Sequence, residues 1–390
     1  MYDIVVVGGG IHGAGVAQAA AVGGYSVLLL EKSDIADGTS SKSSKLIHGG
    51  LRYLESGQFS LVKECLHERE LLLKNAPHLV ELKPFIIPVY SDTSRSALKI
   101  RAGLSLYALL NGMKRTGRFQ SVVKSAWYNL DGLTENNLQH VFQYWDAQTN
   151  DKLLTQSVIK SAEEFDAEVK TNSELLSANY VNDQWLIKTN VNGKESEVQA
   201  KVVINAGGPW VNHINDRFSP LPSKIKIDLV QGSHIIVDGD VSQGIYYLEA
   251  PTDKRAVFVM PWYGDTMIGT TELTYSGEPE KVQPTDGEIK YLISTAKHYF
   301  LKFRSLTNDD VKQSFAGLRV LPADDGSAFS RSRETIIHED KQNAPQLFSI
   351  YGGKLTAYRA TAENVIQRIK HYLPIHKIRG DTKKIKLPAI

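Results

Sequence analysis

Cysteine is almost absent from this chain, and long apolar runs are missing altogether. Cys65 is the single cysteine among 390 residues, which excludes an internal disulfide and a zinc site built on cysteine pairs and is typical of a reducing compartment. No stretch approaches the ~18 consecutive apolar residues that a membrane-spanning helix needs. The N-terminus enters an apolar segment at once, without a basic leader and cleavage site. We therefore expect a cytoplasmic protein.

An excess of one charge is also lacking, because the formal net charge is only +2. Affinity for a phosphate backbone depends mostly on surplus Lys and Arg, so a general nucleic-acid binder is not expected. The composition is 42% hydrophobic, typical of a folded protein, and at roughly 150 residues per domain the length predicts two or three domains. Two segments depart from this balance. Residues 93–130 carry seven Lys and Arg and no acid, and residues 368–386 carry seven against Asp381.

A glycine-rich turn lies between an expected strand at 4–7 and an Ala-rich helix at 13–22. The stretch Gly8-Gly9-Gly10-Ile11-His12-Gly13 fits G-x-G-x-x-G, and Glu31 follows the next expected strand, 26–30. Gly8 permits the tight turn, Gly10 lets a pyrophosphate approach the backbone, and Gly13 allows close helix–strand packing, while the helix N-terminus presents N–H groups to phosphates. Glu31 can accept hydrogen bonds from ribose hydroxyls. The pattern predicts dinucleotide binding rather than an unliganded turn.

The residues after Glu31 favour FAD over NAD. An NAD enzyme usually repeats the strand–helix unit here, whereas residues 33–53 form a Ser- and Thr-rich loop that suits a flavin needing many hydrogen bonds. Gly352-Gly353, before an expected helix at 356–369, would direct positive dipole toward the flavin pyrimidine, where negative charge collects on reduction. We expect non-covalent FAD, with Cys65 as a small core residue in a helix at 60–75.

The order of the expected elements predicts an α/β (α+β) fold, with a Rossmann-like FAD-binding domain and an inserted, mostly antiparallel substrate domain. Strands are expected at 181–188, 198–205, 225–237, 256–261, 267–270 and 347–351, and a helix at 285–300. We assign 1–90, 146–222 and 312–375 to the FAD-binding domain, 91–145 and 223–311 to the substrate domain, and 376–390 to a basic C-terminal tail.

Several longer stretches resemble the FAD-dependent glycerol-3-phosphate dehydrogenases, within the D-amino-acid-oxidase-like flavoenzymes. The most specific is residues 39–55, which contain Ser-Ser-Lys-Leu-Ile-His-Gly-Gly-Leu-Arg-Tyr-Leu. Others are 6–15, 205–211, 232–237, 268–272, 316–321 and 352–359. Two features depart from the family's pattern: its usual C-terminal helical domain is not expected within these 390 residues, and Glu272 stands where Asp is usual.

The resemblance implies oxidation of sn-glycerol 3-phosphate to dihydroxyacetone phosphate, with hydride passing to flavin N5. A phosphate dianion calls for fixed cations, best of all Arg, and Arg319 lies in an apolar run where a cation without an anion is costly. A base should take the hydroxyl proton. His234 is the first choice, and Arg319 or Lys354 are the alternatives.

The candidate residues fall into three groups, with no metal ion expected. The catalytic candidates are His234, Arg319 and Lys354. The substrate-binding candidates are Arg52, Tyr53, Thr270 and Arg333. The cofactor-binding candidates are Gly8, Gly10, Ile11, Gly13, Glu31, Lys32, Thr39, Ser40, Ser41, Ser44, Lys45, Leu46, His48, Gly49, Ala206, Gly207, Trp210, Gly353, Lys354, Leu355 and Thr356.

Alternatives to this function stay open. The same fold serves amine and 2-hydroxy-acid oxidases, and a non-catalytic flavoprotein is a third hypothesis. No motif chooses among quinone, oxygen and a carrier as electron acceptor, and the oligomeric state is open. The acid-free segment 93–130 contains an apolar run at 100–110, which is either a buried helix or a basic amphipathic helix on an anionic leaflet. Because the family feeds the quinone pool, we expect a peripheral protein on the inner face of the cytoplasmic membrane.

Overall fold

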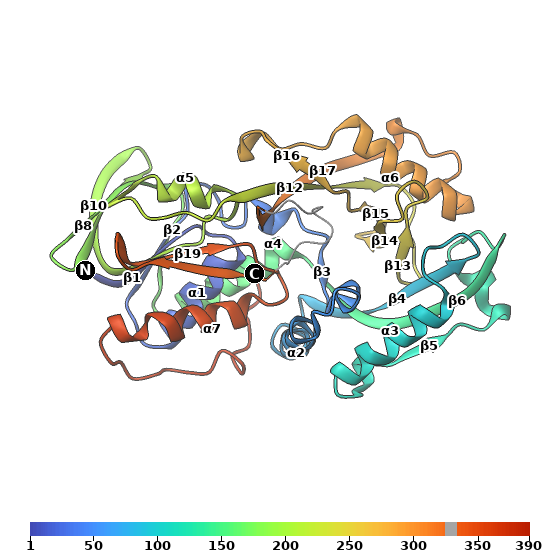
Figure 1. Cartoon of the computed structure of the whole chain (residues 1–390), viewed down its shortest axis with the longest axis horizontal. Coiled ribbons are helices and arrows are strands. Elements are labelled where there is room, and N and C mark those ends of the chain that lie inside the picture. Colours follow the sequence, from blue (N-terminus) through green and yellow to red (C-terminus); the bar gives the residue numbers. More distant parts are fainter. Residues whose placement is uncertain (324–333) are drawn as a thin grey trace.

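The computed structural model describes residues 1–323 and 334–390. Two large sheets lie at opposite ends of the long axis, with helices packed on each (Figure 1). One sheet contains the strand that opens the chain, and the other is formed mostly from the middle of the sequence. The fold is the expected α/β arrangement, with a Rossmann-like unit and a second sheet.

The first sheet is built around the N-terminal strand β1 (Tyr2–Val7). Its main path runs β11-β8-β9-β10-β1-β2-β7, and β1 is parallel to both β2 and β10. Strand β19 adds to β10 in parallel, and β18 pairs antiparallel with β19. The other bounds are β2 (Val27–Leu30), β7 (Glu168–Lys170), β8 (Ser173–Val181), β9 (Gln184–Val191), β10 (Lys194–Asn205), β11 (Phe218–Ser219), β18 (Ile336–Asp340) and β19 (Ala344–Tyr351).

Helices α1 (Ile11–Val22), α4 (Asp151–Glu163) and α7 (Tyr358–Ile369) pack together against this sheet. Helix α1 is buried on almost every side, which explains why its sequence is small and apolar rather than amphipathic. A Cβ at Gly15 would lie 2.8 Å from the Tyr358 ring, so α7 crosses α1 at a point where no side chain fits. A short helix, α5 (Val211–Asn215), follows β10.

The second sheet is antiparallel in every strand pair described except β4 with β13, which is parallel. Its path is β16-β12-β15-β14-β13-β4-β6-β3, with β17 on β12 and β5 on β6. The bounds are β3 (Leu46–Ile47), β4 (Val80–Tyr90), β5 (Phe119–Ser121), β6 (Leu138–Thr149), β12 (Ile227–Val237), β13 (Ile245–Glu249), β14 (Ala256–Trp262), β15 (Asp265–Gly269), β16 (Leu273–Tyr275) and β17 (Val311–Pro322). Its helices are α2 (Phe59–Asn75), α3 (Ala97–Leu110) and α6 (Asp286–Tyr299).

Most of the expected elements are confirmed, and the differences have local causes. The helices expected at 60–75 and 285–300 are α2 and α6, and Thr285 begins α6 with a capping box to Glu288. The strand expected at 181–188 begins later, at Gln184 of β9, because Asn182 and Asp183 both have positive φ and form the tight turn of a β8–β9 hairpin. Helix α7 begins at Tyr358, after the expected start at residue 356.

The predicted domain boundaries stay a prediction, but the sheets divide the chain differently. Residues 1–90 were assigned to the FAD-binding domain, yet β3 and β4 belong to the second sheet. Strand β17 also pairs with β12 rather than with β19. Such long-range pairing is invisible in the strands' own residues, because an apolar strand fits either sheet. The basic tail packs on the first sheet's helices, with Arg379 N–H on the Val22 carbonyl (2.8 Å) and Leu387 6% exposed.

A buried ion pair ties α2 to β6. Arg69 Nη1 lies 2.5 Å from Asp146 Oδ1, and neither side chain is exposed. The other oxygen of Asp146 accepts from the Tyr107 hydroxyl of α3 at 2.7 Å, and that hydroxyl accepts the Gly49 N–H at 2.8 Å. Helices α2 and α3, strand β6 and the backbone after β3 are therefore joined by one connected set of hydrogen bonds.

Removing the acid from this set should destabilise the protein strongly. We expect Asp146→Ala to lower the free energy of unfolding by about 3–5 kcal/mol, since it removes the buried acid on Arg69 Nη1 and the acceptor of the Tyr107 hydroxyl, and leaves Arg69 with only the partly exposed Glu70 as an acidic partner. Asp238→Ala is the control, because Asp238 pairs with Lys312 but is 81% exposed, and its effect should stay within about 0.5 kcal/mol. Urea unfolding followed by circular dichroism measures both, and equal losses would contradict a stabilising role of the buried Arg69–Asp146 pair.

Candidate functional site

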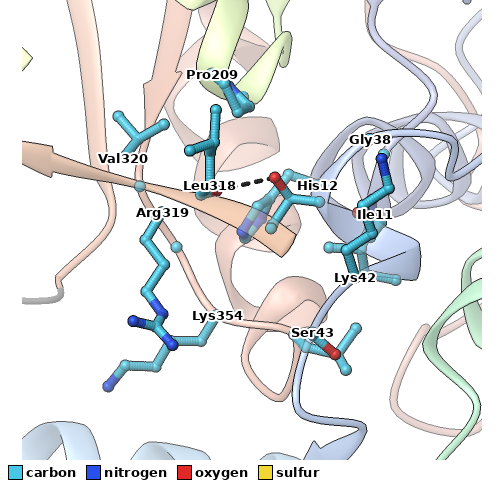
Figure 2. Close-up of a pocket in the computed structure, with 18 of the residues that line it drawn as sticks. Ile11, His12, Gly38, Lys42, Ser43, Pro209, Leu318, Arg319, Val320 and Lys354 are labelled. Carbon is cyan, nitrogen blue, oxygen red and sulfur yellow. Dashed lines mark hydrogen bonds between the residues drawn. The ribbon is translucent and has the colours of Figure 1, made fainter. Parts of the chain in front are cut away.

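A cavity of about 820 Å³ lies between the two sheets and is lined by residues from both. Its walls come from the turn after β1, the loop after β2, the end of β10, strands β12 and β17, and the turn after β19. Figure 2 shows Ile11, Gly38, Pro209 and Leu318 around this space. A volume of this size is in the range of pockets that hold a large organic ligand.

The glycine turn forms one end of the cavity. Gly8 has φ +110°, and a Cβ there would lie 2.7 Å from the Ala206 carbonyl oxygen. A Cβ at Gly13 would lie 1.8 Å from the Gly8 carbonyl oxygen, so the helix can approach the strand only without side chains. The N–H of Ile11, the first residue of α1, donates a hydrogen bond to Ser40 Oγ at 2.9 Å. This close, side-chain-free helix start is what a pyrophosphate requires.

Glu31 lies at the same end of the cavity and holds the backbone there by hydrogen bonds. Its Oε2 accepts the Gly9 N–H at 2.6 Å, and its Oε1 accepts both the N–H (2.9 Å) and the hydroxyl (3.0 Å) of Ser33. A carboxylate can accept about four hydrogen bonds, so capacity remains for a ligand hydroxyl. Nearby, Lys32 lies over the Trp210 ring at 4.2 Å and pairs with Glu280 at 2.8 Å.

The Ser- and Thr-rich loop crosses from the first sheet to the second. Thr39 donates to the Leu318 carbonyl of β17 at 2.9 Å. Ser43 donates its N–H (2.9 Å) and hydroxyl (2.6 Å) to Asp151 Oδ2, and Lys45 Nζ lies 2.6 Å from Asp151 Oδ1. Burial lowers the pKa of Lys45, while Asp151 acts in the opposite direction. The loop is thus fixed at both ends before it meets any ligand.

His234 lies on β12 in the middle of the cavity wall and is 1% exposed. Its Nε2 is 3.0 Å from Ser44 Oγ, its ring stacks on Phe315 at 5.0 Å, and its Nδ1 has no hydrogen-bond partner in the described part of the chain. Burial, followed by the charges of Arg319 and Lys45, holds the pKa of His234 well below its usual value. The ring is therefore neutral at physiological pH, with a lone pair on one of its two nitrogens.

Two cations stand on the same side of the cavity. Arg319 on β17 donates from Nη2 to Thr270 Oγ1 at 3.0 Å, and Lys354 Nζ lies 3.9 Å from the centre of the Tyr53 ring. Figure 2 shows the Arg319 and Lys354 side chains extending in the same direction from β17 and the turn after β19. A Cβ at Gly232, next to Arg319, would lie 2.7 Å from Nη2, so glycine makes room for the guanidinium.

The turn after β19 meets the start of α1. Gly353 has φ +112°, and a Cβ there would lie 2.0 Å from His12 Nε2. Lys354, Leu355 and Thr356 line the cavity, but they precede α7 by a turn instead of forming its first residues. Thr356 Oγ1 accepts the His48 N–H at 3.2 Å. Burial lowers the pKa of His12 to about 4, so this imidazole is also neutral.

Most of the predicted residues line this one cavity. It brings together His234, Arg319, Lys354, Arg52, Tyr53 and Thr270 with the cofactor candidates Gly8, Gly10, Ile11, Glu31, Lys32, Thr39, Ser40, Ser44, Leu46, His48, Ala206, Gly207, Trp210, Gly353, Leu355 and Thr356. Arg333 lies outside the described residues. Their individual roles stay predictions.

Four predicted cofactor residues support the walls from behind. Gly13, Ser41, Lys45 and Gly49 do not line the cavity. Gly13 contacts Gly8, Ser41 donates to the Gly38 carbonyl at 3.2 Å, Lys45 is held by Asp151, and Gly49 N–H is held by Tyr107. A sequence motif shared with a family gives the position of such residues along the chain, but it does not give the direction in which each side chain points.

Sequence reasoning missed several lining residues, notably His12, Lys42, Arg255, Phe258 and Pro209. His12 could have been found, because it sits within the glycine stretch itself. Pro209 follows the Asn205–Gly208 stretch in the same way. Arg255 and Phe258 come from a turn and strand whose residues carry no local signal for a binding site.

The donors and the shape of this cavity fit FAD. The Gly8–Gly13 turn leaves space that any side chain would fill, Glu31 offers acceptors for ribose hydroxyls, and the second end is lined by hydroxyls and cations. No group of three or more His, Cys, Asp or Glu within residues 1–323 and 334–390 could hold a metal ion. Cys65 is 1% exposed, and burial raises the pKa of its thiol to about 11.

Comparisons with known proteins agree with this site. Residues 3–359 match the model of the FAD dependent oxidoreductase (DAO) family. The chain is 39% identical over 376 residues to the aerobic glycerol-3-phosphate dehydrogenase of Escherichia coli (strain K12), covering 95% of this chain and 74% of that protein. It is 38% identical to the D-erythritol 1-phosphate dehydrogenase of Brucella abortus (strain 2308), covering 99% and 77%.

Among solved structures, the glycerol-3-phosphate dehydrogenase of Bacillus halodurans, complexed with FAD, superposes with a TM-score of 0.77. The match has 26% identity and covers 99% of this chain and 68% of that one. The fingerprint, the cavity and these matches lead to one conclusion: the chain belongs to the DAO family of FAD-dependent oxidoreductases.

Proposed function

We propose that the protein is an FAD-dependent dehydrogenase that oxidises the secondary alcohol of glycerol 3-phosphate to dihydroxyacetone phosphate. A single cavity runs from the dinucleotide fingerprint to a group of cations beside a neutral, buried histidine. The names and identities of the relatives support the same reaction. When bound, FAD supplies the hydride acceptor.

The two ends of the cavity would have different tasks. The Gly8–Gly13 turn and Glu31 would hold the adenosine diphosphate half of FAD, while His48 and the residues Lys354 to Thr356 would hold the flavin half. We assign substrate binding to Arg52, Tyr53, Thr270 and Arg333. Arg319, anchored on Thr270 Oγ1, would hold the substrate oxygens by charge-assisted hydrogen bonds, since a guanidinium cannot lose its proton here.

His234 would take the hydroxyl proton as the hydride leaves. Its low pKa keeps the imidazole neutral, so a lone pair is available at either Nδ1 or Nε2. Ser44, whose Oγ lies 3.0 Å from Nε2, would fix the orientation of the ring. Arg319 beside the reacting oxygen would stabilise the alkoxide character that develops, because positive charge at fixed distance needs no reorganisation.

We further propose that the protein binds an anionic membrane surface and passes electrons to quinone. Helix α3 buries Ile100, Leu104 and Tyr107 in the second sheet's core. The exposed surface of residues 97–128, the α3 surface, carries large apolar side chains together with cations. It comprises Leu98, Arg101, Leu109, Met113, Lys114, Arg115, Arg118, Val123, Lys124 and Tyr128. No helix described in residues 1–323 and 334–390 is long and apolar enough to cross a membrane.

Two cations of residues 93–130 are paired with acids from other parts of the fold. Segment 93–130 has no acid of its own, but Arg95 pairs with Glu55 and Glu249, and Lys99 pairs with Glu55. These two cations are therefore not available to a leaflet. The remaining five Lys and Arg of the α3 surface are exposed, and each Lys or Arg near an anionic leaflet contributes about 1 kcal/mol.

The substrate is tested by anaerobic mixing of the yellow holoenzyme with several compounds. We expect glycerol 3-phosphate to bleach the flavin absorbance near 450 nm, while glycine, sarcosine and 2-hydroxyglutarate leave it unchanged, since only the first brings a phosphate dianion to the cations. D-erythritol 1-phosphate belongs in the same series, because a relative of similar identity is named for it. Bleaching by that compound alone, by an amine, or by none of them would contradict the proposed reaction.

Arg319 is tested by substitution. We expect Arg319→Leu to keep FAD but to lose at least tenfold in the rate of flavin reduction, because a charge-assisted hydrogen bond contributes about 1.5–3 kcal/mol. The control is Arg304→Leu, an exposed arginine of the second sheet's helical layer. Stopped-flow absorbance measures both variants, and a normal rate in Arg319→Leu would remove this residue from the site.

Membrane binding is tested by sedimentation with phosphatidylglycerol vesicles. We expect binding to weaken as salt rises from 0.1 M to 1 M, because the Debye length falls from ~10 Å to ~3 Å. Lys114→Glu with Arg115→Glu should weaken binding further. The matched control is Lys188→Glu with Lys194→Glu, two exposed lysines of the β9–β10 hairpin. Equal loss in the two double variants, or no binding at 0.1 M salt, would contradict the assigned surface.

A further inference from the structure

Arg52 and Tyr53 reach the cavity from a single short turn, the 3₁₀ helix η2 (Leu51–Leu54). It begins after Gly50, which has φ +78°, and none of its four residues is fully buried. A 3₁₀ segment of this length has poor hydrogen-bond geometry. Its position must therefore be set by contacts with the rest of the protein.

Glu55, the residue at the end of η2, provides such a contact. Its Oε1 accepts from Arg95 Nε at 2.8 Å, and its Oε2 accepts from Arg95 Nη2 at 2.8 Å. This is the bidentate pairing of guanidinium and carboxylate, which fixes orientation as well as distance. Lys99 Nζ adds a contact of 3.0 Å to Oε1, but its side chain is 60% exposed, whereas that of Arg95 is 13% exposed.

Arg95 is itself held from a third side. Its Nη1 lies 2.6 Å from Oε1 of Glu249, the last residue of β13. Glu249 also accepts the N–H of Ser94 at 2.7 Å and its hydroxyl at 2.9 Å, and its side chain is 7% exposed. The Arg95 guanidinium is therefore held by Glu249 of the second sheet and by Glu55 at the same time. Arg95 joins η2 to that sheet through two fixed carboxylates.

The charges of this group keep the contact intact at physiological pH. The side chains of Arg95 and Lys99 lower the pKa of Glu55 to about 2, so its carboxylate is ionised. An exposed ion pair between two point charges contributes little to the stability of the fold. A bidentate arginine that is mostly buried and paired on both sides loses little side-chain entropy in holding one geometry.

We propose that Arg95 is a positioning residue for substrate binding: by holding Glu55 bidentately, it fixes η2 and so places Arg52 and Tyr53 at the substrate end of the cavity. This inference rests on the proposed function of the site. Arg95 lines no part of the cavity and touches no reacting atom. Its effect passes through the backbone of η2.

The experiment compares Arg95→Ala, Arg95→Lys and Glu55→Gln with the matched control Lys99→Ala, which removes the other cation on the same carboxylate. Each holoenzyme is assayed for KM and kcat with glycerol 3-phosphate, for FAD affinity by fluorescence, and for amide hydrogen exchange in residues 53–58. Those residues contain the turn's own hydrogen bonds, from Tyr53 N–H to the Gly50 carbonyl (2.9 Å) and from Gln58 N–H to the Tyr53 carbonyl (3.1 Å).

We expect Arg95→Ala to raise KM about tenfold, with kcat changed less than about threefold and FAD affinity unchanged. Exchange in residues 53–58 should become at least tenfold faster. Glu55→Gln should act in the same direction, and the double variant should add little, because both remove one interaction. Arg95→Lys, which cannot pair bidentately, should recover part of the KM, and Lys99→Ala should stay within twofold of wild type.

Two results overturn the inference. One is unchanged exchange in residues 53–58 of Arg95→Ala, and the other is a loss of FAD affinity in parallel with the rise in KM, which would indicate a general structural role. Failure of the proposed function is seen separately, as a wild-type flavin that glycerol 3-phosphate does not reduce. In that case the exchange measurement still decides whether Arg95 fixes η2.

Discussion

The site depends on one buried ion pair, Lys45 with Asp151, whose side chains are 6% and 0% exposed. Removing two charges from water is costly, and the cost is offset only when geometry and further hydrogen bonds satisfy both ions. Asp151 meets this condition, since it also accepts the N–H and hydroxyl of Ser43. The pair anchors the loop to the start of α4 at the point where the chain passes from the first sheet to β3 of the second.

The loop held by this ion pair contacts the strands that carry His234 and Arg319. Ser44 lies between the two anchored residues, and its hydroxyl meets His234 on β12. On the other side, Thr39 bonds the β17 carbonyl next to Arg319. A Cβ at Gly317 would lie 2.6 Å from the Lys42 carbonyl oxygen, so loop and strand are in close contact. The loop thereby sets the distance between the fingerprint and the two residues proposed for catalysis.

Local patterns in the sequence predicted the local parts of this arrangement. The strand–glycine–helix unit with Glu31 follows from residues close together in the chain, and the apolar surroundings of Arg319 pointed to a ligand. Contacts between distant residues could not be predicted. Lys45 looked like a cofactor ligand because its partner, Asp151, lies 106 residues away. Arg95 looked like a free cation because its acids come from residues 55 and 249, and charge counted along a segment says nothing about neighbours across the fold.

The place of β1 in its sheet has a consequence for biosynthesis. Strand β1 lies at residues 2–7, but its parallel neighbour β10 ends at Asn205. Strand β19, which pairs in parallel with β10, ends only at Tyr351. On the ribosome the fingerprint therefore emerges long before the strands that bury it, and non-local pairing of this kind is slow and exposes apolar surface meanwhile. The complete FAD site therefore forms only after residue 351 has been synthesised, and the apolar strands before it lack their partners until then.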